Sequence, residues 1–264
     1  MRRTPLIYVL SFLSTIIFAD DAVQPLRIMP VGDSITRGTY LGRDEDGNAT
    51  GLPSKLGGGW RKVLQDYLRA EEITFEFVGE LDYNAYGDKG VANPAFSQKH
   101  HGLAGFGNQA ILNGGVVPTP KDVLAAKGVA EIRVPGIVEA LKTNKPDIVL
   151  LMSGANGFDE RQRDKLITTI CENFQGILIV ASITPQKPPR AGYEKVVPYN
   201  SSLPGTVERL KSKGFKIYFV DMYLALSVDD ISADGVHPTA AGMEKMASIW
   251  FAAIKPFLKS QSRN

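Results

Sequence analysis

The sequence has little of two residue types that often carry chemistry, because its 264 residues include one cysteine and three histidines. The single cysteine, Cys171, cannot form a disulfide within the chain, so we expect the fold to depend on its hydrophobic core. Cys171 lies in a segment with helical spacing, which favours a buried structural thiol over a nucleophile. Any imidazole base must be His100, His101 or His237.

Neither sign of charge is in large excess, with 30 basic residues against 28 acidic ones and a net charge of +2. A nucleic-acid partner normally requires a basic surface, so we expect none. Hydrophobic residues at 44% and charged residues at 22% are ordinary for a globular protein. The length fits one α/β domain, and we find no internal repeat and no low-complexity tract.

The apolar run near the N-terminus, residues 5–18, is shorter than the roughly 20 residues of a membrane-spanning helix and is diluted by Ser and Thr. Arg2 and Arg3 precede this run and Ala19 follows it, which is typical of a secretory signal. We therefore predict a signal peptide over residues 1–19 and one domain over residues 20–264. The protein should be secreted and extracellular, without stable membrane association.

Two sequons for N-glycosylation fit export by a eukaryotic route. Asn48 lies in a polar loop where a glycan could be attached. Asn200 follows a proline and opens a run with helical spacing, so its side chain is equally compatible with a buried or capping role.

Five apolar runs rich in Ile, Val and Phe predict strands that are covered on both faces. They begin at Leu26, Ile73, Asp147, Ile177 and Lys216. Segments with helical spacing alternate with them, over residues 59–72, 131–144, 161–174, 199–213 and 239–258. This alternation predicts a three-layer α/β/α fold with a five-stranded parallel sheet. Ligands bind beyond the carboxyl ends of such strands, so the residues after each run are the candidates for a site.

The first strand is followed by Gly32-Asp33-Ser34-Ile35-Thr36, which would place a serine at the start of a helix. Ser34 can be a nucleophile, but Asp and Ser are also favoured as helix N-caps. The chain lacks the G-x-S-x-G elbow around this serine, which excludes an α/β-hydrolase.

Asp234-Gly-Val-His237-Pro238 precedes the last predicted helix. Its spacing allows the Asp234 carboxylate to bind one ring nitrogen of His237, leaving the other to accept a proton from a serine. A surface turn with a solvated histidine is the alternative.

Two further motifs follow predicted strands. In Ser153-Gly154-Ala155-Asn156-Gly157, the Asn156 amide can donate to a developing oxyanion, although Asn-Gly is also a preferred turn. The glycine-containing segment from His100 to Gly107 could bring a backbone N–H close to a substrate. Adjacent histidines rarely share a metal, and the acidic loop from Asp44 to Lys55 fails the calcium-loop pattern, so we predict no metal site.

With these four motifs in this order, the chain resembles the SGNH hydrolases, also called GDSL-type esterases and lipases. The resemblance implies a flavodoxin-like fold and a serine esterase that needs no metal or organic cofactor. It implies Ser34, His237 and Asp234 as catalytic residues. The oxyanion hole would comprise the N–H groups of Ser34 and Gly105 and the side chain of Asn156.

The segments IMPVGDSITRG, KPDIVLLMSGANG, VASITPQ and DGVHPTAAGMEKMASIW resemble carbohydrate esterase family 3, which includes acetylxylan esterases. We therefore expect a monomer that acts on O-acyl groups, in particular O-acetyl groups, of carbohydrate. Six aromatic residues near predicted loops could stack on sugar: Tyr40, Trp60, Tyr83, Tyr86, Phe106 and Phe158. A lipid or short-chain esterase and a non-catalytic carbohydrate-binding descendant are the alternatives.

The sequence departs from the family pattern at two motifs. The usual His-Glu-Gly is His100-His101-Gly102, and the usual Gly-Thr-Asn-Asp is Gly154-Ala155-Asn156-Gly157. These departures leave the expected catalytic residues in place and bear on the pocket for the acyl group and the sugar.

Overall fold

The computed structural model describes residues 24–39, 42–43, 49–50, 58–82, 97–118 and 131–258. The predicted signal peptide, the sequon at Asn48 and the aromatic residues Tyr40, Tyr83 and Tyr86 lie outside the described residues.

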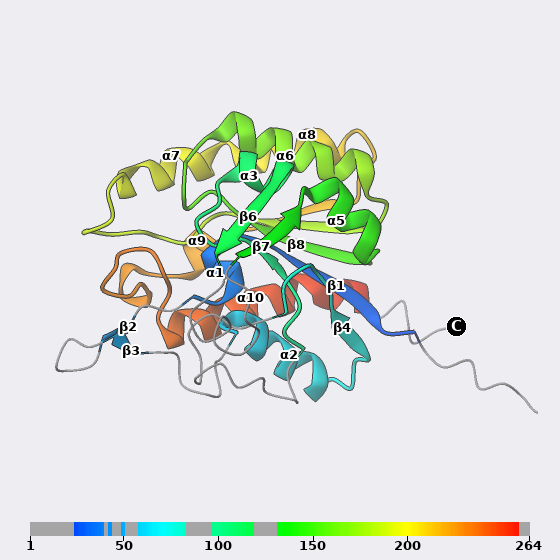
Figure 1. Ribbon diagram of the computed structural model, residues 1–264, viewed down its shortest axis with the longest axis horizontal. Coiled ribbons are helices and arrows are strands. Elements are labelled where there is room, and N and C mark those ends of the chain that lie inside the picture. Colours follow the sequence, from blue (N-terminus) through cyan, green and yellow to red (C-terminus); the bar gives the residue numbers. More distant parts are fainter. Residues whose placement is uncertain are drawn as a thin grey trace, which may run out of the picture.

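A parallel sheet forms the centre of the molecule (Figure 1). Its strands, in spatial order, are β10 (Ile217–Val220), β9 (Ile177–Ala181), β8 (Ile148–Met152), β1 (Leu26–Gly32) and β4 (Phe75–Phe77). All five predicted strands are therefore confirmed, and their order is that of flavodoxin-like folds. A sixth, two-residue strand that we did not predict, β5 (His101–Gly102), pairs with Val31 and Gly32 of β1 beyond the end of β4.

Two hydrophobic clusters lie on opposite faces of the sheet because successive side chains of each strand alternate between them. In β8, Ile148, Leu150 and Met152 belong to one cluster, whereas Val149 and Leu151 belong to the other. The first cluster contains the inner faces of α2 and α10, and the second contains those of α5, α6 and α8 (Figure 1). This arrangement is the predicted three-layer fold.

The helices range from four residues in α1 and α9 to 19 residues in α10. They are α1 (Ser34–Arg37), α2 (Trp60–Ala70), α3 (Asn108–Asn113), α5 (Ile137–Asn144), α6 (Glu160–Asn173), α7 (Val196–Ser201), α8 (Leu203–Lys211), α9 (Met222–Ala225) and α10 (Ala240–Leu258), with 3-10 turns η3 (Tyr193–Lys195) and η4 (Val228–Asp230). The stretch of helical spacing predicted over residues 199–213 is confirmed as far as Lys211, but it comprises two helices that meet at Ser202. Among the helices of the described residues, none combines the length and apolarity needed to cross a bilayer.

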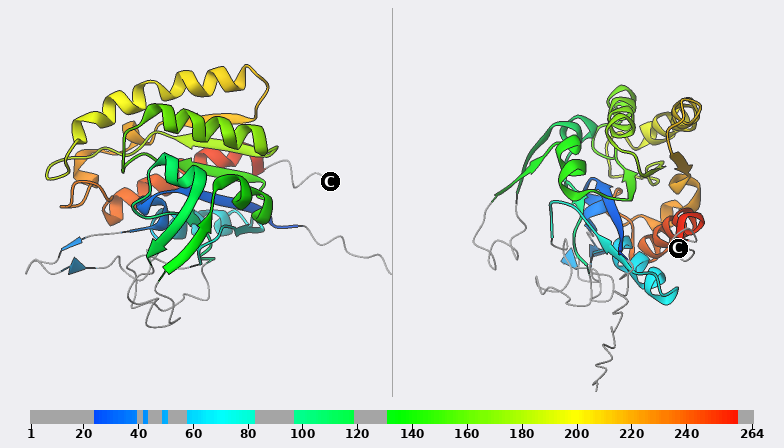
Figure 2. Two further views of the ribbon diagram at one scale, coloured as in Figure 1. Left: turned by 45° about the horizontal axis from the view of Figure 1, so that its top comes forward. Right: turned by 90° about the vertical axis from the view of Figure 1, so that its right-hand side faces the viewer.

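The prediction of one helix over residues 131–144 is wrong in its first half. Glu131–Pro135 forms strand β7, which pairs antiparallel with β6 (Gly114–Pro118), and the helix begins only at Ile137. A proline at position 135 disfavours helical backbone at Val134, which explains the extended conformation. Figure 2 shows this hairpin projecting away from the sheet. A second, minimal pair joins β2 (Gly42–Arg43) to β3 (Ala49–Thr50).

Candidate active site

Ser34 is the first residue of α1 and lies directly beyond the carboxyl end of β1. Asp33 is the N-cap, because its Oδ1 accepts a hydrogen bond from the Ile35 N–H at 3.0 Å. The capping role considered for Ser34 therefore belongs to its neighbour. Gly32 is required by close packing, since a Cβ there would lie 2.1 Å from the Met152 carbonyl oxygen.

Ser34 contacts a histidine that is 203 residues away in the sequence. Its Oγ lies 2.8 Å from Nε2 of His237, and Nδ1 of His237 lies 2.6 Å from Oδ2 of Asp234. The structure thus brings together the serine, imidazole and carboxylate that the spacing of the motifs suggested. In this order of contacts, a neutral imidazole protonated at Nδ1 has its Nε2 free to accept the serine proton.

The Asp234 carboxylate is fixed by a tight turn of backbone and side chains. Its Oδ1 accepts hydrogen bonds from the N–H groups of Val236 (2.8 Å) and His237 (3.0 Å) and from the Ser232 hydroxyl (2.9 Å). Burial raises the pKa of Asp234, but the hydrogen bonds from the His237 ring and from the two backbone N–H groups outweigh burial and hold this pKa below its usual range. The carboxylate is therefore ionised at neutral pH.

A second carboxylate, Asp230, anchors the turn that carries Asp234 and His237 to α10. It accepts hydrogen bonds from Lys245 at 2.8 Å and from the N–H of Ser227 at 2.8 Å, and its own carbonyl accepts one from the N–H of Thr239 at 2.7 Å. Burial opposes ionisation of Asp230, but the hydrogen bond from Lys245 and those from Ser227 lower its pKa overall. No short motif marks this anchor, because the Lys245 that pairs with Asp230 lies 15 residues away in the last helix.

The two remaining motif residues, Gly105 and Asn156, lie in neighbouring loops. Gly105 is exposed, with φ of +80°, in the turn after β5. Asn156 lies in a turn after β8, and its Nδ2 donates a hydrogen bond to the carbonyl of Phe106 at 3.2 Å. A side-chain amide has a second N–H, which this bond does not use.

The loop that carries Asn156 lies beside the turn that carries Ser34. The Asp33 carboxyl is fully buried, which raises its pKa, while the N–H groups of Ile35 and Ala155 and the nearby His237 act in the opposite direction. The residue before Asn156 is thus adjacent to the residue before Ser34. The first and third motifs meet at this point, as expected for the ends of the neighbouring strands β1 and β8.

A buried arginine holds the other end of α1. Arg61 donates hydrogen bonds to the carbonyl oxygens of Thr36 (3.0 Å), Arg37 (2.9 Å) and Gln98 (2.8 Å). Burial, reinforced by the nearby charge of Arg37, lowers the pKa of Arg61 to about 9. The Arg61 guanidinium thus provides hydrogen bonds for carbonyl groups that the end of a short helix leaves without a partner. Position 61 gives no such signal in the sequence, where it is one arginine in an amphipathic helix.

The other two histidines, His100 and His101, are buried in the core. Nδ1 of His100 accepts a hydrogen bond from the Gly102 N–H at 2.9 Å. His101 is fully buried with neither ring nitrogen hydrogen-bonded, and burial lowers its pKa to about 4. Within the described ranges, no group of three or more potential metal-ligating side chains is found.

Three other predicted features have clear positions. Cys171 is buried and unpaired, and burial together with the charge of Glu172 raises its pKa to about 11. The Asn200 side chain is buried and bonded to both the N–H and the carbonyl of Ile183, each at 3.0 Å, so the buried alternative is confirmed for this sequon. Of the described aromatic candidates, Trp60 is fully buried against Trp250, which excludes it as a sugar platform.

Comparison with known proteins places this chain in a family. The family model described as GDSL-like lipase/acylhydrolase matches residues 28–250. A multidomain esterase of Ruminococcus flavefaciens is 27% identical over 272 residues, which cover 95% of this chain and 31% of that protein. The chain thus spans less than a third of the length of this curated relative.

Solved structures agree with the family match. A family 3 carbohydrate esterase of Clostridium thermocellum has a TM-score of 0.61 and 25% identity, covering 90% of this chain and 98% of that structure. A family 3 carbohydrate esterase of Talaromyces cellulolyticus, with a TM-score of 0.62 and 19% identity, covers 89% of this chain and 99% of its own and shows the shared fold.

The family match extends from the strand before Ser34 to the helix after His237, so it includes all four motifs. It confirms the resemblance to the GDSL-type esterases and lipases. The chain belongs to the GDSL-like lipase/acylhydrolase family.

Proposed function

We propose that the chain hydrolyses O-acetyl esters of carbohydrate, with Ser34 as nucleophile, His237 as general base and Asp234 as the group that orients the imidazole. The observation that carries this proposal is the continuous series of contacts from Ser34 Oγ to His237 Nε2 (2.8 Å) and from His237 Nδ1 to Asp234 Oδ2 (2.6 Å). Such a series lets a neutral imidazole accept a proton from a hydroxyl that is otherwise weakly nucleophilic.

In the proposed reaction, Ser34 Oγ attacks the ester carbonyl carbon while its proton passes to His237 Nε2. The tetrahedral intermediate then breaks its bond to the alcohol oxygen, which takes the proton back from the imidazolium and leaves. An acyl group remains on Ser34. Water attacks this acyl group with His237 again as base, and the acid is released. The reaction requires no metal or organic cofactor.

The oxyanion of the intermediate would be stabilised by the N–H groups of Ser34 and Gly105 and by the Asn156 amide. The position of the Asn156 amide beside the Gly105–Phe106 segment, 3.2 Å from the Phe106 carbonyl, supports a shared role. Removal of one oxyanion donor typically lowers turnover about 10²- to 10³-fold. We therefore expect that loss in kcat for Asn156→Ala, with Asn173→Ala, an exposed amide at the end of α6, as the unaffected control.

The choice of substrate is supported by the likeness to the family 3 carbohydrate esterase of Clostridium thermocellum, at 25% identity over 90% of this chain. Lipid and short-chain esters remain the competing class, because the family model is named for lipases and acylhydrolases. Release of acetate from acetylxylan should exceed release of fatty acid from a lysophospholipid. The opposite ranking would favour the lipid alternative.

The nucleophile is tested with Ser34→Ala and a fluorophosphonate probe. We expect covalent labelling of the wild type at Ser34, no labelling of the variant, and loss of activity on a chromogenic acetate ester. Full activity of Ser34→Ala would contradict the assignment. Failure of folded wild-type protein to react with the probe would favour the non-catalytic carbohydrate-binding alternative.

The remaining expectations concern the setting of this activity. We propose that the protein is secreted after loss of residues 1–19 and acts outside the cell as a monomer, with no nucleic-acid partner and no stable membrane association. The nearly balanced charge and the composition of the first 19 residues support this proposal. N-terminal sequencing of protein from a culture supernatant tests the cleavage site.

A further inference from the structure

Three buried side chains from separate elements form a closed ring of hydrogen bonds next to the candidate active site. The Ser153 hydroxyl donates to Oδ1 of Asn108 at 2.7 Å, and Nδ2 of Asn108 donates to the Tyr199 hydroxyl at 3.0 Å. The Tyr199 hydroxyl in turn donates to the Ser153 carbonyl at 2.9 Å. All three residues are at least 95% buried, so each bond forms away from water.

The ring joins the two loops that carry the proposed oxyanion donors. Asn108 opens α3, three residues after Gly105, and Ser153 follows β8, three residues before Asn156. The bond from Asn156 Nδ2 to the Phe106 carbonyl is a second link between the same two loops. The loops are therefore tied to each other at two points close to the donors.

Gly154 permits this arrangement. It has φ of +126°, and a Cβ at this position would lie 2.1 Å from the Tyr199 hydroxyl oxygen. A side chain here would exclude Tyr199 from the Ser153 carbonyl. Only glycine combines this backbone conformation with so close an approach.

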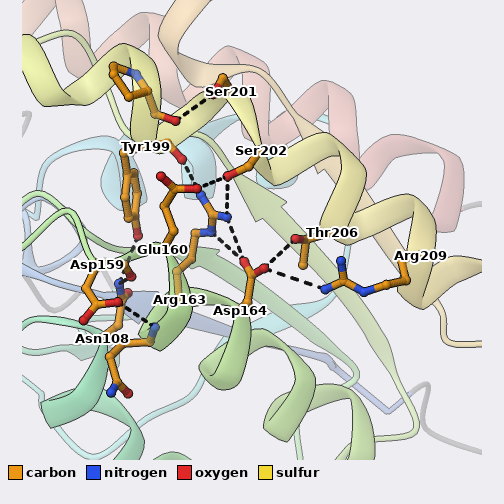
Figure 3. A network of polar contacts seen from close by, with 12 residues as sticks. Asn108, Asp159, Glu160, Arg163, Asp164, Tyr199, Ser201, Ser202, Thr206 and Arg209 are labelled. Carbon is orange, nitrogen blue, oxygen red and sulfur yellow. Dashed lines mark hydrogen bonds and ion pairs between the residues drawn. The ribbon is translucent and has the colours of Figure 1, made fainter.

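Tyr199 is itself held by Arg163, which is buried beneath it (Figure 3). The Arg163 guanidinium lies 4.9 Å from the centre of the Tyr199 ring and donates a hydrogen bond to the Tyr199 carbonyl. It also donates to Asp164 at 2.8 Å and to Ser202 at 3.0 Å, and Asp164 accepts a further bond from Thr206 at 2.7 Å. These contacts lock α6, α7 and α8 around Tyr199.

Such a network is costly unless it is complete, because each buried polar atom left without a partner costs about 1–3 kcal/mol. An apolar contact between the loops would avoid that cost but would not fix their distance and orientation so closely. Burial strongly raises the pKa of the Tyr199 hydroxyl, so the group remains a donor over the whole range of pH at which an esterase works. The Tyr199 hydroxyl is therefore able to donate its hydrogen bond to the Ser153 carbonyl throughout that range.

We propose that Tyr199 and Asn108 are positioning residues for the oxyanion hole, acting through the distance between the Gly105 and Asn156 loops. This inference rests on the proposed function of those two residues. A misplacement of about 1 Å in a catalytic group can lower the rate by about 10²-fold. A defect in the ring should consequently lower kcat and leave substrate binding almost unchanged.

The test is Tyr199→Phe, which keeps the ring stacked on Arg163 and removes only the hydroxyl. We expect kcat on a chromogenic acetate ester to fall about tenfold or more, with KM within about twofold of wild type. The concentration of active enzyme is measured by fluorophosphonate titration, so that unfolded protein does not lower the value of kcat. Tyr193→Phe, an exposed tyrosine that is 42% accessible, is the matched control and should not change kcat.

A double-mutant cycle separates positioning from general stability. In the Asn156→Ala background, where one of the two donors is already absent, Tyr199→Phe should lower kcat by a smaller factor than it does in the wild type. An equal loss in both backgrounds, or wild-type kcat for Tyr199→Phe, would overturn the inference. If Tyr199→Phe does not fold, Ser153→Ala serves in its place, because it removes only the bond to Asn108.

Failure of this inference differs from failure of the proposed function. An active wild type with an unaffected Tyr199→Phe variant overturns the positioning role alone. A wild type that releases no acid from any ester overturns the proposed function and the positioning role together.

Discussion

The conversion of Asp234 to asparagine tests the proposed relay most directly, because the structure determines which way the new amide must face. Oδ1 of Asp234 accepts three hydrogen bonds, whereas Oδ2 accepts one, from Nδ1 of His237. An amide NH₂ at the Oδ1 position would meet three donors, each left unpaired at about 1–3 kcal/mol. The asparagine carbonyl must therefore occupy the Oδ1 position.

The NH₂ group then lies against Nδ1 of His237 and donates to it. The imidazole responds by carrying its proton on Nε2, so it donates to Ser34 Oγ and cannot accept the serine proton. Loss of the correct tautomer in this type of relay lowers kcat about 10⁴-fold, which corresponds to about 5.5 kcal/mol of activation free energy. We expect a loss of that size for Asp234→Asn.

The assay is kcat on a chromogenic acetate ester at pH 7 to 8. Asp229→Asn is the matched control, because it removes the same charge from an exposed position five residues earlier in the same segment, and it should retain wild-type kcat. With only three histidines in the chain, ¹⁵N NMR can identify the His237 tautomer directly. An Asp234→Asn variant within tenfold of wild type, or one with its proton on Nδ1, would refute the reasoning.

Three further predictions concern buried groups outside the relay. Burial lowers the pKa of His101 from 6.5 to about 4. Between these two pH values the imidazole is protonated in the unfolded chain and neutral in the folded protein. Stability attributable to His101 is complete above pH 6.5 and falls by about 3 kcal/mol toward pH 4, so urea denaturation of His101→Leu should show a shallower acid dependence than wild type. An identical slope would contradict this assignment. Asn200→Ala should lower the free energy of unfolding by about 2 kcal/mol, because it leaves the N–H and carbonyl of Ile183 unpaired, and an unchanged urea midpoint would argue against that. Cys171 should react with a thiol reagent only after denaturation, releasing one equivalent per chain, since it is buried and its pKa is raised to about 11. Rapid reaction of the native protein would show that the thiol is accessible.

The strands and the nucleophile–base pair could be predicted because their signals are local. Each of the five predicted strands lies in a short apolar run, and β8 is buried at every position, so its shortness and its β-branched residues identify it as a strand. Ser34, Asp234 and His237 stand in short motifs after such runs, and a parallel sheet brings the carboxyl ends of its strands to one edge. The contacts that join them could then be expected without a structure.

The hairpin β6–β7 was missed because its signal is weaker than that of a buried strand. In β7 only Val134 is buried, Ile132 is half-buried, and the remaining residues are polar or proline. Alternation over five residues competes poorly with the helical spacing that follows it. The extended backbone expected before Pro135 was the available signal.

The ring of Asn108, Ser153 and Tyr199 could not be predicted for a different reason. Each of these side chains has an ordinary local explanation, as a polar residue at a helix start, a loop serine and an aromatic residue on an amphipathic helix. Their meaning depends on partners that are 45, 46 and 91 residues apart. Neither periodicity nor a short motif can predict contacts between residues that are so far apart in the sequence.

Three residues that depart from the family pattern, Ala155, Gly157 and His101, differ in their surroundings in the structure. Gly157 replaces an acidic residue, and a Cβ there would meet no atom within 4 Å, so the substitution removes a group from open space and leaves the framework of the loop unchanged. His101 replaces a glutamate in the core, where burial keeps the imidazole neutral and an unpaired ionised carboxylate would be far more costly. Ala155 is buried in the hydrophobic core on one face of the sheet. The departures therefore spare the contacts that hold Ser34 and the two donor loops, and of the three only Gly157 is in a position to alter what the site binds.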